Sequence, residues 1–280
     1  MIKKSEYLSE RKDDIVNGEI LSEENYNFYL KLFEHQEEYT EKYSFKDFPS
    51  YIDKESFPAL NAEKIALSDN NRHILIASLE GFVRIISEFH TGFSLERLLS
   101  PVRNDEDSLP SLLRSFLSDD HAVLSSVAAD TGIGVEELVF IITNWFKPFI
   151  IKMRRDFFSE RNTDEWLEKT CPFCGSYPDM VKIIEARDNS RFLHCSFCEQ
   201  EWKFQRFGCT MCGNVIHEKM GFYEFEDSFY RFDYCDACKG YIKTLRVPQK
   251  NREDSFDLAV ENIITNYLDA SAIKMGYKKL

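Results

Sequence analysis

Four short stretches decide the fold of this chain: 171-CPFCG-175, 195-CSFC-198, 209-CTMCG-213 and 235-CDAC-238. They contain all eight cysteines of the 280 residues. In each stretch two residues separate the cysteines, which lets both sulfur atoms of a tight turn reach one metal ion. The candidate metal ligands are therefore Cys171, Cys174, Cys195, Cys198, Cys209, Cys212, Cys235 and Cys238.

The spacing between the pairs predicts two separate metal sites. Twenty residues separate the first pair from the second, and twenty-two separate the third from the fourth. Such spacing is typical of zinc ribbons, in which a hairpin brings one cysteine turn opposite another. Gly175 and Gly213 directly follow the first and third pairs, where glycine suits a backbone turn with positive φ. This favours sequential pairing, while a nested or crossed pairing stays open because sequence does not fix cysteine connectivity.

The ligand set restricts the metal and its role. Both zinc and iron accept tetrahedral thiolate coordination, so we expect two metal ions, zinc or iron, each bound by four cysteines. A closed four-cysteine site has no open position for water, which favours a structural role over metal catalysis. Thiol–disulfide chemistry is the rival interpretation of a C-x-x-C pair, but four regularly placed pairs fit two metal centres better. We expect His194 and His217 not to be ligands, because each site already has four sulfur atoms.

Periodic apolar residues predict an all-helical N-terminal domain. One stripe consists of Tyr26, Tyr29, Leu30 and Phe33, at the spacing of a single helix face. Similar stripes lie within residues 75–89 and 112–117, and the longest expected helix runs from about residue 135 to 158. Packing alone accounts for such stripes, so we expect the core faces of a helical bundle.

The pattern changes near residue 166. Short aromatic and β-branched runs such as 180-MVKII-184 and 222-FYEF-225 predict short strands. From about Asp254 a last helix is expected, with apolar positions at Leu258, Ile263, Ile264, Tyr267 and Leu268. The predicted fold class is α plus small β: a helical domain over 1–165, a first four-cysteine ribbon over 166–204, a second over 205–250, and a C-terminal helix over 251–280.

Charge and hydropathy restrict the class of protein. The formal net charge is −13, yet residues 171–250 contain eleven acidic and eleven basic side chains. A neutral ribbon segment argues against binding to a nucleic-acid backbone, which depends on a basic surface. The acidic excess elsewhere favours a basic partner or simply keeps the protein soluble. There is no apolar run long enough to span a membrane and no N-terminal signal sequence, so we expect a cytoplasmic protein without membrane insertion.

The cysteine turns and their flanking residues resemble the signature of the formate dehydrogenase accessory protein family, FdhE. The resemblance covers 171-CPFCGSYP-178 and 191-RFLHCSFCEQEW-202, continues through 209-CTMCG-213 and 234-YCDACKGYIKTL-245, and includes Gly276 and Tyr277. It is specific over roughly residues 166–280. Over the first 165 residues it consists only of similar length and helical character.

This resemblance implies a cytoplasmic maturation chaperone. Such a protein would bind the catalytic subunit of formate dehydrogenase, which carries a twin-arginine export signal, before export. The resemblance also implies a helical region joined to two rubredoxin-like modules, with the eight cysteines as metal ligands. A homodimer is left open. We expect no enzymatic activity, because no catalytic triad, P-loop or nucleotide-binding fingerprint is evident.

Two other functions stay open on the sequence alone. A nucleic-acid-binding zinc-ribbon protein could stack bases on Phe197, Trp202 and Phe204, although the charge distribution leads us to expect no nucleic acid. A rubredoxin-like electron carrier would need iron in its four-cysteine sites.

Overall fold

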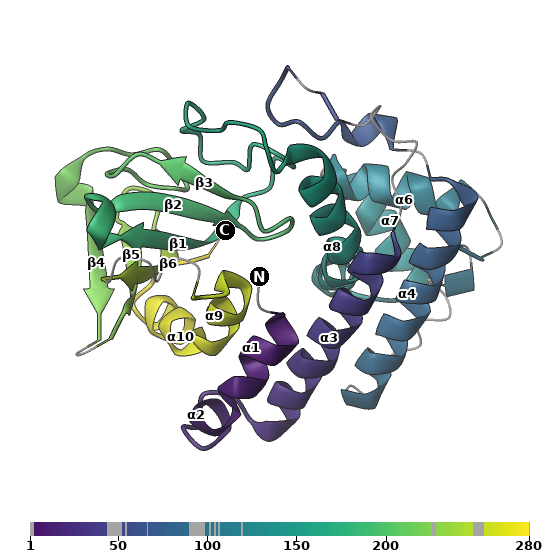
Figure 1. Cartoon of the computed structure of the whole chain (residues 1–280), viewed down its shortest axis with the longest axis horizontal. Helices are drawn as coiled ribbons and strands as arrows, with labels where there is room; N and C mark the ends of the chain where they lie inside the picture. The colour runs from purple at the N-terminus through teal and green to yellow at the C-terminus, as the bar shows by residue number, and fades with distance from the viewer. Residues whose placement is uncertain are drawn as a thin grey trace. The chain divides into compact units, whose positions relative to one another are not determined.

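The computed structural model describes residues 3–43, 52–53, 55–65, 67–89, 99–100, 102–103, 105, 107–118, 120–225, 228–248 and 255–279. The chain forms two compact units (Figure 1). One unit consists of Glu23–Ser159, and the other combines Met1–Ser22 with Glu160–Leu280. Each unit is described by itself.

The first unit is helical. Its elements are α3 (Glu23–Lys42), η2 (Ala62–Lys64), α4 (Asp69–Phe89), α6 (Ser108–Leu117), α7 (His121–Thr131) and α8 (Val135–Phe158). Helix α3 contacts both α4 and α8. The Trp145 side chain of α8 is buried and donates its Nε1–H to the Leu75 carbonyl at 2.9 Å. A side chain at Gly81 would place its Cβ 2.7 Å from the His35 ring, so a glycine there permits the close approach of α3 and α4.

The helical prediction holds for this unit, with one difference in α3. The predicted long helix is α8, and the stripe that ends at Phe89 is α4. In α3, however, Phe28 and Leu32 are buried, whereas Tyr29 and Leu30 are only half-buried. Because α3 contacts two other helices, its buried surface is wider than the single stripe that periodicity predicts.

The second unit is built around a six-stranded sheet. Its strands are β1 (Pro178–Ile184), β2 (Ser190–Cys195), β3 (Glu201–Phe204), β4 (Met220–Glu224), β5 (Tyr230–Cys235) and β6 (Gly240–Val247). Their order is β3-β2-β1-β6-β5-β4. The first three strands pair antiparallel, as do the last three, and β1 pairs parallel with β6. Two antiparallel ribbons are thus joined into one continuous sheet.

Two C-terminal helices pack on this sheet, α9 (Leu258–Ile264) and α10 (Asn266–Lys274). Leu258 of α9 packs with Met180 and Leu245, and Leu268 of α10 packs with Phe232 and Tyr241. The single helix expected here is therefore two helices, separated at Thr265. The break turns Tyr267 outward, to 36% exposure, although periodicity assigns it to the apolar face.

The N-terminal helices α1 (Lys4–Glu10) and α2 (Lys12–Val16) belong to the same unit as the sheet. The carboxylate of Glu261 in α9 is fully buried and forms an ion pair with Arg11 at 2.5 Å. It also accepts hydrogen bonds from the hydroxyl groups of Tyr7 in α1 and Tyr230 in β5. This cluster of Tyr7, Arg11, Tyr230 and Glu261, called here the Glu261 cluster, ties the beginning of the chain to its end.

The predicted fold class is confirmed: a helical region is followed by a sheet with two four-cysteine clusters and by C-terminal helices. None of the helices in the described ranges is long and apolar enough to cross a membrane.

Candidate metal centres

The first candidate centre lies at one end of the β1–β3 ribbon. Cys171 and Cys174 come from the turn before β1, Cys195 ends β2, and Cys198 lies in the turn before β3. The Sγ atom of Cys174 is 3.5 Å from those of Cys195 and Cys198, and the Sγ atoms of Cys171 and Cys198 are also 3.5 Å apart. The turns of the first two pairs therefore face each other across the hairpin.

The second candidate centre repeats this plan in the β4–β6 ribbon. Cys209 and Cys212 lie in a turn before β4, while Cys235 ends β5 and Cys238 lies in the turn before β6. The Sγ atoms of Cys209 and Cys238 are 3.7 Å apart, and those of Cys212 and Cys235 are 3.9 Å apart. The grouping in both centres is the sequential one, first pair with second and third pair with fourth.

The sulfur geometry fits a tetrahedral metal ion. Within each group all four sulfur atoms lie within 4.8 Å of one another. A tetrahedron with metal–sulfur bonds of about 2.3 Å has an edge of about 3.8 Å, which matches the separations given above. The sulfur–sulfur distances are much longer than the ~2.05 Å of a disulfide bond, and all eight cysteines are free. The residues present can therefore hold two ions.

The same backbone turn positions the sulfurs in all four pairs. The amide that follows each second cysteine donates to the carbonyl of the first cysteine, at 2.8–3.2 Å. The residues that supply these amides all have positive φ: Gly175, Glu199, Gly213 and Lys239. Glycine at the first and third turns is as expected. Glu199 and Lys239 adopt the same conformation despite a steric cost of about 1–2 kcal/mol each. The second and fourth pairs therefore form the same turn as the first and third, although no glycine follows them.

Backbone amides also stabilise the sulfur atoms. Cys195 Sγ accepts from the amides of Phe197 and Cys198, both at 3.4 Å. Cys209 Sγ accepts from the amides of Met211 and Cys212 at 3.4 and 3.5 Å. Hydrogen bonds to the charged form favour a thiolate, which is the form that binds a metal.

Burial opposes the thiolate at several positions. Desolvation raises the pKa of Cys171 and Cys198, and it raises the pKa of Cys238 to about 12. Four thiolates gathered in one shell therefore require a compensating cation, because an uncompensated buried charge is very costly. A divalent ion supplies that charge.

The two centres differ in exposure. In the first, Cys171, Cys195 and Cys198 are buried and Cys174 is half-buried. In the second, Cys212 is exposed and Cys238 is half-buried. Solvent and reagents can therefore reach a sulfur of the second centre more easily.

Neither histidine near the cysteines belongs to the two sulfur groups. His194 is buried, with its Nδ1 atom 2.7 Å from Asp179 Oδ1, and the second oxygen of Asp179 accepts from Asn262 of α9 at 3.1 Å. This polar network beside the first centre was not predicted, because Asn262 lies 83 residues from Asp179. The ring of His217 stacks on Phe207, with centroids 5.0 Å apart.

The aromatic residues considered for base stacking are in the interior. Phe197, Trp202 and Phe204 are only 1–4% exposed. Trp202 donates its Nε1–H to the Glu168 carbonyl at 2.9 Å. Their role in this unit is packing of the first ribbon, so they offer no platform for bases.

Sequence comparisons match this chain to FdhE proteins. A family model described as the central domain of FdhE matches residues 170–206, which include the whole first centre. An FdhE homolog of Aquifex aeolicus is 26% identical over 202 residues, covering 71% of this chain and 65% of the relative. One from Shewanella baltica is 34% identical over 113 residues, covering 39% and 36%. These matches span less than two thirds of the relatives' own length.

A solved structure supports the fold over nearly the whole chain. The crystal structure of the FdhE protein from Pseudomonas aeruginosa superposes with a TM-score of 0.64 and 16% sequence identity, over 99% of this chain and 92% of that one. Fold and cysteine geometry together define a protein with two four-cysteine ribbons, each of which can hold a metal ion. Within that class, the sequence matches described above are to FdhE proteins.

Proposed function

We propose that this protein is an accessory factor for formate dehydrogenase. It binds the catalytic subunit in the cytoplasm before export and acts by binding rather than by catalysis. The observation that carries the proposal is the first four-cysteine centre, which lies within the segment matched by the FdhE family model and is followed by a second centre of the same plan.

The metal ions have a structural role in this proposal. All eight cysteines would be ligands, and zinc or iron would occupy each closed tetrathiolate site. The proposed modules are the ribbons of residues 166–204 and 205–250, which share one sheet through β1 and β6. An ion in each ribbon would hold the turns that begin and connect its strands, at the edge of the sheet where the parallel strands β1 and β6 both begin. Four thiolates around each ion leave no open coordination position for substrate.

Client binding is tested by pull-down. Tagged full-length protein purified with its metals is mixed with the catalytic subunit of formate dehydrogenase carrying its export signal. The expected result is saturable retention of the subunit, and the control is Ser87→Ala, a change of an exposed side chain on α4. Absence of retention by a folded, metal-loaded sample would refute the proposed partner.

Metal content is tested separately by elemental analysis. We expect two equivalents of zinc or iron per chain, and about one equivalent in a variant that carries Cys171→Ser and Cys174→Ser. A colourless protein with stoichiometric zinc would exclude the electron-carrier alternative, whereas a red protein that bleaches on reduction would support it. An intact sample without bound metal would refute the ligand assignment.

A further inference from the structure

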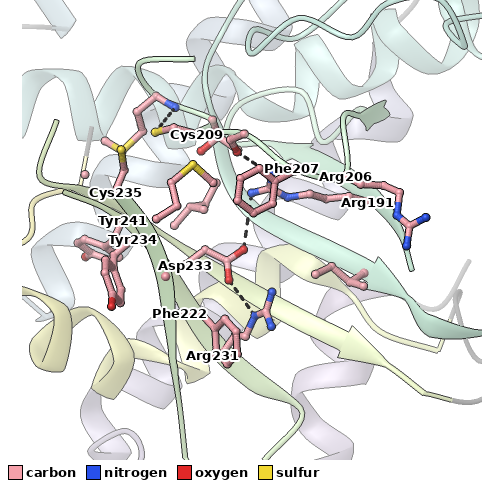
Figure 2. Close-up of a pocket in the computed structure, with 18 of the residues that line it drawn as sticks. Arg191, Arg206, Phe207, Cys209, Phe222, Arg231, Asp233, Tyr234, Cys235 and Tyr241 are labelled. Atoms are coloured by element: carbon pink, nitrogen blue, oxygen red, sulfur yellow. Dashed lines mark hydrogen bonds and ion pairs between the residues drawn. The ribbon is translucent and has the colours of Figure 1, made fainter. Parts of the chain in front are cut away.

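A cavity lies beside the second metal centre, on the face of the sheet opposite α9 and α10. Its volume is 180 Å³, and it is bounded by β4–β6 and the turn that carries Cys209 (Figure 2). On β5, Tyr230 and Phe232 pack toward the helices, so the alternating Arg231 and Asp233 point to the cavity face. Most of the lining is apolar, and it includes Phe207, Met211, Met220, Phe222 and Ile242.

Two guanidinium groups and one carboxylate meet in this cavity. Arg191 comes from β2 and extends past β1 and β6, so that its Nη2 lies 3.6 Å from Asp233 Oδ2. Arg231 Nε lies 2.8 Å from Asp233 Oδ1, and its guanidinium stacks on the Phe222 ring at 4.3 Å. Figure 2 shows both arginines directed at Asp233. The three side chains, called here the Arg–Asp–Arg cluster, are 6–19% exposed and carry one surplus positive charge.

The cluster leaves hydrogen-bonding capacity unused. Among the described residues, Arg191 Nε is shielded from solvent and has no hydrogen-bond partner. Arg231 Nε and Asp233 Oδ1 face each other at 2.8 Å as an ion pair whose geometry is too poorly aligned for a hydrogen bond. Arg191 donates through Nη1 to the Gly208 carbonyl at 2.8 Å. A guanidinium has five N–H donors, so one carboxylate cannot satisfy two of these groups. A buried donor without a partner is costly, and an acceptor in the cavity removes that cost.

We propose that the cavity binds a small organic acid with a ring-sized apolar body and one carboxylate. A cavity of about 150 Å³ holds a benzene ring, so 180 Å³ accommodates a body of that size. One carboxylate balances the surplus charge of the Arg–Asp–Arg cluster, and planar guanidinium groups suit carboxylates geometrically. A filled tetrathiolate site at the Cys209 end would repel an anion, so the carboxylate lies at the Arg231 end, away from Cys209 and Cys235 in Figure 2.

The test uses the metal-loaded full chain and isothermal titration with three probes. Phenylacetate carries the ring and the charge, phenylacetamide keeps the ring without the charge, and acetate keeps the charge without the ring. We expect phenylacetate to bind at least tenfold more tightly than either of the others. Equal affinity for phenylacetamide, or no heat from phenylacetate at millimolar concentration, would overturn the proposal.

Variants locate the site. Arg231→Gln should weaken phenylacetate binding at least tenfold, and Arg231→Lys, which retains the charge, should lose less. The control is Arg103→Gln, because Arg103 forms an exposed ion pair with Glu80 in the helical unit. Near-ultraviolet circular dichroism and metal content establish that each variant is folded. Unchanged affinity in a folded Arg231→Gln protein would refute the assignment, and if that variant does not fold, the comparison of probes on the unmodified chain decides.

Discussion

Removing the carboxylate of Glu261 should destabilise the sheet-containing unit by about 3–5 kcal/mol. This side chain is fully buried and receives three donors: Arg11 Nη1 at 2.5 Å, the Tyr230 hydroxyl at 2.5 Å and the Tyr7 hydroxyl. In Glu261→Ala these donors lose their shared acceptor. A hydrogen bond to a charged group contributes about 1.5–3 kcal/mol, and loss of one partner of a buried ion pair costs about 3–5 kcal/mol.

The magnitude can be divided among the donors. Burial and the adjacent Glu261 carboxylate raise the pKa of both Tyr7 and Tyr230, so both hydroxyls stay protonated and donate throughout the neutral range. Tyr7→Phe and Tyr230→Phe each remove one donor and leave the Arg11–Glu261 pair in place. Each should therefore cost about 1.5–3 kcal/mol, less than Glu261→Ala.

The assay is urea unfolding of the metal-loaded protein in a Trp145→Phe background, followed by tryptophan fluorescence, because the remaining Trp166 and Trp202 both lie in this unit. Glu136→Ala is the control, because Glu136 is an exposed residue in the first turn of α8 and such changes alter stability by about 0.5 kcal/mol or less. A loss below about 1 kcal/mol in Glu261→Ala would show that the Glu261 cluster does not stabilise the unit.

Two further predictions concern a buried lysine and the order of metal release. Burial lowers the pKa of Lys243 to about 8 in the folded protein. Between about pH 8 and 10.5 the unfolded chain therefore binds more protons at Lys243 than the folded chain does. The contribution of Lys243 to the free energy of unfolding accordingly rises with pH in this range. Between pH 7.5 and 9.5 the free energy of unfolding of the unmodified protein should rise by about 1–2 kcal/mol relative to that of Lys243→Met. If the urea midpoints of the two proteins change in parallel with pH, the lowered pKa is contradicted. Because Cys212 is exposed, chelation should release metal first from the second centre. Pulsed alkylation with mass spectrometry should then label Cys209, Cys212, Cys235 and Cys238 before the other four cysteines, and the reverse order would contradict this prediction.

Local sequence determined the helices and the cysteine turns. The apolar stripe of α8 spans five turns or more and predicts its bounds well, because a long amphipathic helix repeats one signal many times. A two-residue spacer likewise restricts where two sulfur atoms can point. The short α9 and α10 lack such repetition, so the break at Thr265 was missed.

The tertiary structure decided how these pieces are joined. Parallel pairing of β1 with β6 brings residues such as Val181 and Thr244 together, and no spacing rule predicts which strand edges meet. The Arg–Asp–Arg cluster depends on that pairing, because it places Arg191 within reach of Asp233. The Glu261 cluster unites residues about 250 positions apart. Cysteine spacing acts locally, because it restricts the backbone within a few residues. The partners of buried charges depend instead on how the whole unit packs, because a charge loses its water only when the chain has folded around it.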